Sequence, residues 1–190
     1  MKKFFSKPFG TDEQPIEEGR YRLFWSPLCP YAHRAVIARE ILGLDDAISL
    51  GTLDYRRGEE GWQFSLDKDG LDPVLKQSKI KDVYLNSDSD YEGPYSVPVL
   101  VDITTGKVVR KESAELLHEF ATVFKKLHKK DGIDLYPEHL AGQIDEWNEK
   151  LAVAINDGVY GMRFAESQEK YDEAFDRFFD MMDVVAVSYT

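Results

Sequence analysis

Cys29 is the only cysteine of the 190-residue chain, and it lies between a short apolar segment, Tyr21–Trp25, and a helix-like segment that begins with Pro30. A cysteine directly before a helix meets unpaired backbone N–H groups and the positive end of the helix dipole. Both favour the thiolate, which is the nucleophilic form, over the thiol. We therefore predict that Cys29 performs thiol–disulfide or thioether exchange; the alternative is a buried, inert thiol. Ala32 stands three residues further on, where a second cysteine would act as resolving thiol, so the exchange partner must come from solution.

Two further pairs of residues have the chemistry of a binding site. Pro98 follows Val97 at the start of a predicted strand, where a residue without an N–H donor is unusual. A cis Val97–Pro98 peptide would explain it and would turn the Val97 main chain toward an incoming peptide; the alternative is a trans proline on an edge strand. Glu112 and Ser113 stand at a predicted helix start, where free N–H groups and a hydroxyl hold a carboxylate and a glutamate holds an ammonium group. The alternative is an ordinary serine cap beside a surface glutamate.

Two aromatic residues stand outside the apolar segments. Trp62 lies in a polar stretch and can either flank a ligand or anchor its loop to the core. Tyr160 lies between Gly158 and Gly161, in what we predict to be a short connection between two helices, and it can either reach a cleft or pack.

The elements that must position these residues follow from the apolar pattern. Strands and helices alternate after a polar N-terminal arm, and the order strand–helix–strand followed by hairpin and helix is thioredoxin-like. The predicted strands are 21–25, 47–53, 97–102 and 107–110, the helices are 30–42 and 113–124, and the last two helices are 141–156 and 168–182. Residues 54–90 are predicted as a long polar loop with one helical turn in 70–78. The first helix is expected to bury Ala35, Val36, Ile37, Ala38, Ile41 and Leu42, and Ser113 is expected to cap its helix.

The fold class predicted from this order is an α/β thioredoxin-like N-terminal domain followed by an all-α C-terminal domain. The predicted boundaries are an arm at 1–19, a thioredoxin-like domain at 20–124, a linker at 125–139 and a partial helical domain at 140–190.

The composition of the chain limits its possible partners, compartment and cofactors. A formal net charge of −11 disfavours nucleic acid and anionic membranes as partners. No apolar run reaches the length of roughly 20 residues that spans a membrane. A single cysteine fits a reducing cytoplasm, and the four histidines show no metal-ligand spacing, so we expect no metal.

Taken together, five phrases resemble the glutathione transferase superfamily and, more narrowly, its Xi class, the glutathionyl-hydroquinone reductases. They are the lead-in and motif Tyr21–Arg34, Gly61–Phe64, Tyr91–Leu100, Lys111–Glu115 and Asn156–Tyr160. The resemblance covers about residues 18–182. It implies a GST-like fold, glutathione as co-substrate and Cys29 as the nucleophile that attacks a glutathione thioether, leaving a mixed disulfide that a second glutathione reduces.

The same resemblance implies roles for the other residues. Glu112 and Ser113 would hold the γ-glutamyl group of glutathione, Val97 and Pro98 would meet its cysteinyl backbone, and Trp62 would lie near its glycyl end. Tyr160 would face the aromatic substrate, together with Tyr31, which replaces a family tryptophan. Pro94 replaces a family arginine, so Arg34 or Arg56 is expected to compensate. The chain is also shorter than family members, so we expect a truncated helical domain, an aromatic pocket that lacks some of its walls, and a homodimer that covers its apolar face.

We therefore predict an enzyme, a glutathione-dependent cysteine-type oxidoreductase acting on glutathionyl-hydroquinones or glutathionyl mixed disulfides. The first alternative is a weakly active module that binds glutathione or a protein. The second is a conventional glutathione transferase, in which the hydroxyl of Ser26 or Tyr31 stabilises the thiolate of glutathione.

Overall fold

The computed structural model describes residues 5–129 and 132–188. The chain divides into two compact units, one ending at Leu135 and the other beginning at Tyr136.

The first unit is built on a four-stranded sheet in the order β2-β1-β3-β4. Its strands are β1 (Tyr21–Trp25), β2 (Ile48–Thr52), β3 (Val99–Asp102) and β4 (Lys107–Arg110). β1 pairs with β2 in parallel, whereas β3 runs antiparallel to both β1 and β4. The central strands are buried on both faces, as expected for a sheet covered by helices on either side.

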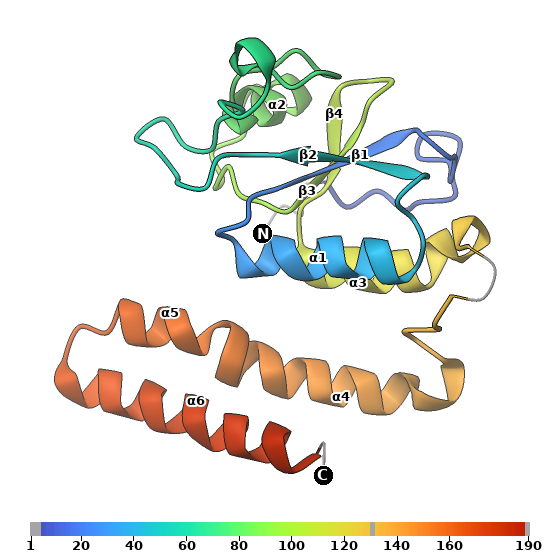
Figure 1. Ribbon diagram of the computed structural model, residues 1–190. Helices are drawn as coiled ribbons and strands as arrows, with labels where there is room; N and C mark the ends of the chain where they lie inside the picture. Colours follow the sequence, from blue (N-terminus) through green and yellow to red (C-terminus); the bar gives the residue numbers. More distant parts are fainter. Residues whose placement is uncertain (1–4, 130–131, 189–190) are drawn as a thin grey trace. The chain divides into compact units, whose positions relative to one another are not determined.

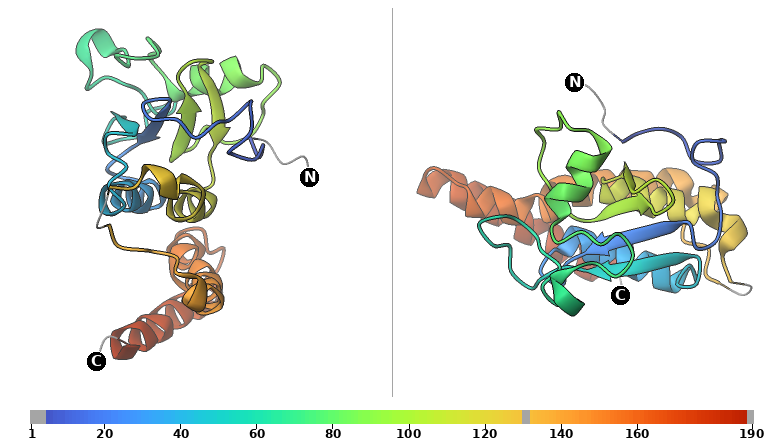
Figure 2. Two further views of the ribbon diagram at one scale, coloured as in Figure 1. Left: turned by 90° about the vertical axis from the view of Figure 1, so that its right-hand side faces the viewer. Right: turned by 90° about the horizontal axis from the view of Figure 1, so that it is seen from above.

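Helices cover both faces of this sheet. α1 (Pro30–Ile41) and α3 (Ser113–Ala121) lie side by side on one face, and α2 (Ile80–Ser87) lies on the other (Figure 1). Figure 2 shows the same layers from two further directions. This order of strands and helices is the thioredoxin-like arrangement, as the sequence predicted.

The inward face of α1 differs from the predicted one. Ala32, Ala35 and Ala38 are buried together with the following Leu42, whereas Ile37 and Ile41 are 45% and 43% exposed. Small side chains let the helix lie close to the sheet and to α3. The prediction counted apolar residues without weighing the close approach that alanine permits.

The prediction of a continuous loop over 54–90 was wrong in its last third. α2 lies there, and it buries Ile80, Val83 and Tyr84, which have the spacing of one helical face. A 3₁₀ turn lies at Lys68–Gly70 and overlaps the segment predicted for the helical turn, 70–78, only at Gly70. A single apolar face of three residues among charged neighbours gave too weak a periodic signal to predict α2.

The N-terminal arm packs against the first unit. The Tyr21 hydroxyl donates to the carbonyl of Pro15, and Arg110 donates to the carbonyls of Phe5 and Lys7. The ring of Phe9 also contacts Tyr21, with the ring centroids 5.4 Å apart. Arm and sheet are therefore joined by hydrogen bonds and by aromatic contacts.

The second unit consists of helices, namely α4 (Ala141–Leu151), a π-helical turn at Ala152–Asn156, α5 (Gly158–Arg163) and α6 (Gln168–Ser188). Residues 157–161 were predicted as a connection between two helices. Asp157 is instead the N-cap of α5, and residues 158–161 form most of that helix. The two glycines lie close to α6: a Cβ on Gly158 would lie 3.2 Å from the Phe178 ring, and one on Gly161 would lie 3.5 Å from Ala174. Gly158 therefore lies in the tight contact between α5 and α6, whereas the position of Gly161 has room for a Cβ.

Within the part of the chain that the structure describes, no helix has both the length and the apolar character needed to cross a bilayer.

Candidate active site

Cys29 is the N-cap residue of α1, and Pro30 is the first residue of the helix, as predicted. The turn that carries the cysteine is anchored at Ser26, whose hydroxyl donates to the Asp54 carbonyl over 2.7 Å. The Cys29 carbonyl then accepts the first helical hydrogen bonds, from the N–H groups of Ala32 and His33. Cys29 as a residue is half-buried. Its sulfur therefore lies at the N-terminus of α1, on a turn fixed by hydrogen bonds.

The main chain of Val97 lies beside this sulfur. The Cys29 Sγ donates to the Val97 carbonyl oxygen over 3.3 Å. The Val97–Pro98 peptide bond is cis, as the sequence predicted. The structure thus brings together Cys29 and Val97, which are 68 residues apart in the chain.

Arg34 and Ser113 form the second part of the site. Arg34, on α1, donates from Nε and Nη2 to the Ser113 hydroxyl oxygen over 3.1 and 2.6 Å. Ser113 was expected to cap α3, but the N-cap residue is Glu112, and no side chain caps the helix. The serine hydroxyl is held by Arg34 instead, so a guanidinium group lies at the N-terminus of α3, where the helix dipole also favours an anion.

Glu112 lies directly beside that position and is mostly exposed. Its carboxylate pairs with Lys111 over 2.8 Å. Burial alone would lower the pKa of Lys111, but Glu112 and Tyr91 together more than offset this effect and the pKa of Lys111 is raised. The α3 start therefore combines a guanidinium, a hydroxyl, a carboxylate and an ammonium group on neighbouring residues.

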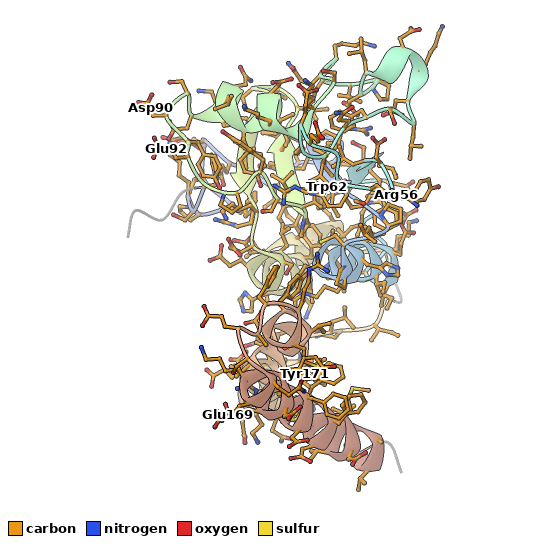
Figure 3. All side chains as sticks on the ribbon, turned by 90° about the vertical axis from the view of Figure 1, so that its left-hand side faces the viewer. Arg56, Trp62, Asp90, Glu92, Glu169 and Tyr171 are labelled. Carbon is orange, nitrogen blue, oxygen red and sulfur yellow. The ribbon has the colours of Figure 1, made fainter. Side chains whose placement is uncertain are left out.

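Trp62 is 8% exposed and belongs to the hydrophobic core cluster against which Cys29 also packs. Its carbonyl accepts the N–H of Ile80, so the tryptophan is tied to the start of α2. Trp62 and Arg56 are carried by the same long connection between β2 and α2 (Figure 3). Arg56 is exposed there, whereas Arg34 is the arginine that the structure places at Ser113.

The two aromatic residues expected at the substrate lie in different units. The Tyr31 ring lies under the Arg34 guanidinium, with 5.5 Å between the guanidinium carbon and the ring centroid. Tyr160 is 40% exposed on α5, and its ring stacks on Phe164 with the centroids 6.4 Å apart. The first unit therefore joins Cys29 to Val97 and, as a second group, Arg34 to Ser113 and Tyr31, while Tyr160 belongs to the second unit.

Sequence reasoning missed the pair that anchors the long connection. Arg22 donates from Nε and Nη2 to one Asp72 oxygen over 2.9 and 2.7 Å, and both side chains are buried. The other Asp72 oxygen accepts the N–H groups of Val74 and Leu75. The two residues are 50 positions apart, and the one available signal was an arginine inside an apolar strand.

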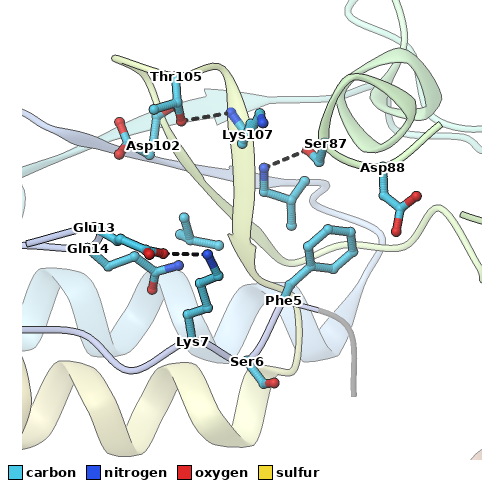
Figure 4. Close-up of a pocket in the computed structure, with 12 residues that line it drawn as sticks. Phe5, Ser6, Lys7, Glu13, Gln14, Ser87, Asp88, Asp102, Thr105 and Lys107 are labelled. Carbon is cyan, nitrogen blue, oxygen red and sulfur yellow. Dashed lines mark hydrogen bonds and ion pairs between the residues drawn. The ribbon is translucent and has the colours of Figure 1, made fainter. Parts of the chain in front are cut away.

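A separate cavity of about 600 Å³ lies between the N-terminal arm, β4 and the end of α2 (Figure 4). It is at the far end of the sheet from Cys29, since its lining residue Asp102 pairs with Tyr21 at the start of β1. Gln14 lines it, and the Gln14 Oε1 has no hydrogen-bond partner among the described residues. That atom is almost wholly covered, so it offers no contact to a molecule in the cavity.

Among the described residues, no group of three or more histidine, cysteine, aspartate or glutamate side chains is arranged to hold a metal ion.

The fold and this site can now be compared with known proteins. The family model of the glutathione S-transferase N-terminal domain matches residues 28–123. The glutathionyl-hydroquinone reductase YqjG of Escherichia coli is 38% identical over 177 residues, which are 92% of this chain and 54% of that protein. Among solved structures, the Xi glutathione S-transferase of Phanerochaete chrysosporium matches with a TM-score of 0.87 and 36% identity, over 95% of this chain and 63% of that one. The glutathione-bound structure of YqjG matches with a TM-score of 0.85 and 38% identity, over 94% of this chain and 59% of that one.

A thioredoxin-like sheet followed by helices, with a cysteine at the start of the first helix, is thus the framework of a glutathione transferase. The chain belongs to the glutathione transferase superfamily, and its homologues there include Xi-class enzymes and glutathionyl-hydroquinone reductases, as the sequence motifs indicated. The chain spans about half the length of the curated relatives it matches.

Proposed function

We propose that this protein is a glutathione-dependent, cysteine-type oxidoreductase that reduces glutathionyl-hydroquinones or glutathionyl mixed disulfides. The observation that carries the proposal is the sulfur of the half-buried residue Cys29, which lies at the N-terminus of α1 and 3.3 Å from the Val97 carbonyl oxygen. Relatives named as glutathionyl-hydroquinone reductases and a glutathione-bound relative support it.

In the proposed reaction, the Cys29 thiolate attacks the sulfur of a glutathionyl-hydroquinone. The bond between that sulfur and the aromatic carbon breaks, the carbon takes up a proton, and hydroquinone leaves with the two electrons. The two sulfurs are oxidised to a mixed disulfide between Cys29 and glutathione. A second glutathione thiolate attacks the glutathione sulfur of that disulfide, releases Cys29 as a thiolate and forms glutathione disulfide. A glutathionyl mixed disulfide as substrate would be reduced by the same exchange.

The remaining residues are proposed to bind glutathione. Arg34 and Ser113 would hold the α-carboxylate of the γ-glutamyl group, and Glu112 would hold its ammonium group. Two N–H donors of Arg34 already converge on the Ser113 hydroxyl, so an incoming carboxylate meets a charge-assisted donor at that point.

The cysteinyl and glycyl parts of glutathione would lie along the rest of the site. The Val97 main chain, followed by Pro98, would pair with the cysteinyl backbone, and Trp62 would lie near the glycyl end. Tyr31 and Tyr160 would face the aromatic substrate.

A conventional transferase reaction receives less support from the geometry. It needs a hydroxyl that donates to the thiolate of glutathione, but the Ser26 hydroxyl donates to the Asp54 carbonyl and accepts the Leu28 N–H. Cys29, by contrast, places its sulfur at the helix start. Because the same hydroxyl anchors the turn that carries Cys29, Ser26→Ala is expected to lower turnover but still to form the Cys29–glutathione mixed disulfide.

The test compares Cys29→Ala and Cys29→Ser with the wild-type chain in a steady-state assay with glutathionyl-menadione and glutathione. We expect both substitutions to remove turnover, because no other cysteine can form the mixed disulfide. Intact mass after incubation with glutathione disulfide should show one glutathione adduct on the wild type and none on either variant. Wild-type-like turnover in Cys29→Ala would refute the proposal, and an adduct without turnover on any glutathionyl substrate would favour a binding module.

A further inference from the structure

The loop that leads from α2 to β3 carries Val97, and three tyrosine hydroxyls donate to carbonyl groups of this loop. Tyr91 donates to Pro94 over 3.2 Å, and Tyr95 donates to Tyr91 over 3.2 Å. Both bonds join residues of the loop to each other. The third, from Tyr84 to the Ser96 carbonyl over 2.9 Å, starts on α2 and therefore ties the loop to the helix.

Tyr84 itself is held firmly by its surroundings. Its side chain is fully buried, and its ring stacks on Tyr91 with the centroids 5.1 Å apart and an angle of 15° between the planes. Tyr95 and Phe5 each contact it edge-on at 5.8 Å. Burial raises the pKa of Tyr84, so its hydroxyl keeps its proton and remains a donor.

The bond from Tyr84 bears directly on the contact with Cys29. The Ser96 carbonyl and the Val97 N–H belong to one planar peptide unit, so a fixed carbonyl oxygen also fixes the direction of the Val97 N–H. The carbonyl of Val97, the next one along the chain, accepts a hydrogen bond from the Cys29 Sγ. The hydrogen bond from Tyr84 therefore ends one residue before the carbonyl that faces the reactive sulfur, although Tyr84 lies outside every motif of the sequence.

We infer that Tyr84 is a positioning residue of the thiol-exchange site: its hydroxyl orients the Ser96–Val97 peptide on which a glutathionyl substrate docks beside Cys29. This inference rests on the proposed function. It adds to the proposed site a residue that contacts neither the substrate nor the sulfur.

The test uses Tyr84→Phe, which removes the hydroxyl and keeps the ring. Tyr21→Phe is a matched control, because Tyr21 is also fully buried and donates one hydrogen bond to a loop carbonyl, that of Pro15. Two reagents are compared on Cys29: glutathione disulfide, which must dock on the peptide, and iodoacetamide, which needs no docking.

For Tyr84→Phe we expect the rate of mixed-disulfide formation with glutathione disulfide to fall about tenfold, the effect of one lost hydrogen bond to an oriented group. Alkylation by iodoacetamide should change less than about twofold, because the helix start that holds the sulfur is untouched. Tyr21→Phe should leave both rates within about twofold. The inference is overturned if Tyr84→Phe slows both reagents equally, or if it behaves like Tyr21→Phe.

A second measurement separates this inference from the proposed function. Amide hydrogen exchange in the peptide covering residues 91–100 needs no glutathione, and it should be faster in Tyr84→Phe than in Tyr21→Phe or the wild type. Unchanged exchange overturns the inference whatever the enzyme does. If exchange is faster in Tyr84→Phe but the wild-type chain never reacts with glutathione disulfide, then Tyr84 does hold the loop and the proposed chemistry is wrong.

Discussion

Arg34 is the residue that we propose to supply the cation for glutathione. The sequence resemblance implied that Pro94 replaces an arginine and that Arg34 or Arg56 compensates for the lost charge. In the structure Arg34 donates twice to the Ser113 hydroxyl and lies over the Tyr31 ring, whereas Arg56 is exposed on the long connection. Arg34 is therefore the better candidate for the cation that meets glutathione.

We predict that Arg34→Ala raises the KM for glutathione about tenfold, since a charge-assisted hydrogen bond contributes about 1.5–3 kcal/mol. The kcat should fall much less, because Arg34 donates to the Ser113 hydroxyl and makes no hydrogen bond to the sulfur of the N-cap residue. Steady-state kinetics with glutathionyl-menadione measure both constants.

Arg56→Ala removes the same charge from the same unit and serves as the control. Its KM should stay within about twofold of the wild type, since an exposed charge contributes little. A larger KM effect for Arg56→Ala than for Arg34→Ala would reverse the assignment.

Residue types and local spacing were enough to predict several features of the site. Cys29 at a helix N-cap and Pro30 in the first turn were confirmed, because each depends on two or three adjacent residues. The cis Val97–Pro98 peptide was confirmed too, but the local residues left cis and trans open, and Cys29 upstream favoured cis. The Ser113 cap was wrong because a residue on another helix, Arg34, competes for the hydroxyl. The roles proposed for these residues in binding glutathione stay predictions.

At the scale of elements, the strands were predicted well and the segment between them poorly. A run such as Val99–Asp102 is short, apolar and buried on both faces, which is the pattern of a strand inside a sheet. The stretch from Asp54 to Ser78 is held instead by hydrogen bonds between distant residues. The Arg22–Asp72 pair is the strongest example, because its members are 50 positions apart and no local pattern links them.

We predict that Asp72→Asn lowers the free energy of unfolding by about 3 kcal/mol, since it leaves the buried Arg22 guanidinium without its counterion. In one orientation the amide NH₂ of the new asparagine would face the N–H donors of Arg22. In the other it would face the N–H groups of Val74 and Leu75 and lose their hydrogen bonds. Urea unfolding measures the loss, and amide exchange over residues 62–80 should rise because the tether of this connection is gone.

Asp69→Asn is the matched control for that experiment. Asp69 is exposed in the same connection and loses the same charge, and asparagine tolerates its positive φ of 60°. Its stability should stay within about 0.5 kcal/mol of the wild type. Equal losses in the two variants would show that the buried pair contributes nothing specific.

At the scale of the whole molecule, the charge of the chain opposes the ligand that we propose for it. The formal net charge is −11, and glutathione and glutathione disulfide carry more carboxylates than ammonium groups. The cations at the start of α3 act at contact distance, whereas the excess of acidic residues acts over many ångströms. Salt screens the second effect far more than the first, because charges further apart than the Debye length of about 10 Å at 0.1 M no longer interact strongly.

We therefore predict that the reaction of Cys29 with glutathione disulfide becomes faster, by about twofold to fivefold, when salt rises from about 20 mM to about 500 mM. The uncharged reagent iodoacetamide reports any effect of salt on the sulfur itself, and its rate should stay constant. The ratio of the two rates isolates the long-range repulsion. A ratio that falls with salt would mean that the local attraction at Arg34 and Lys111 outweighs the net charge, and Arg34→Ala should then abolish that fall.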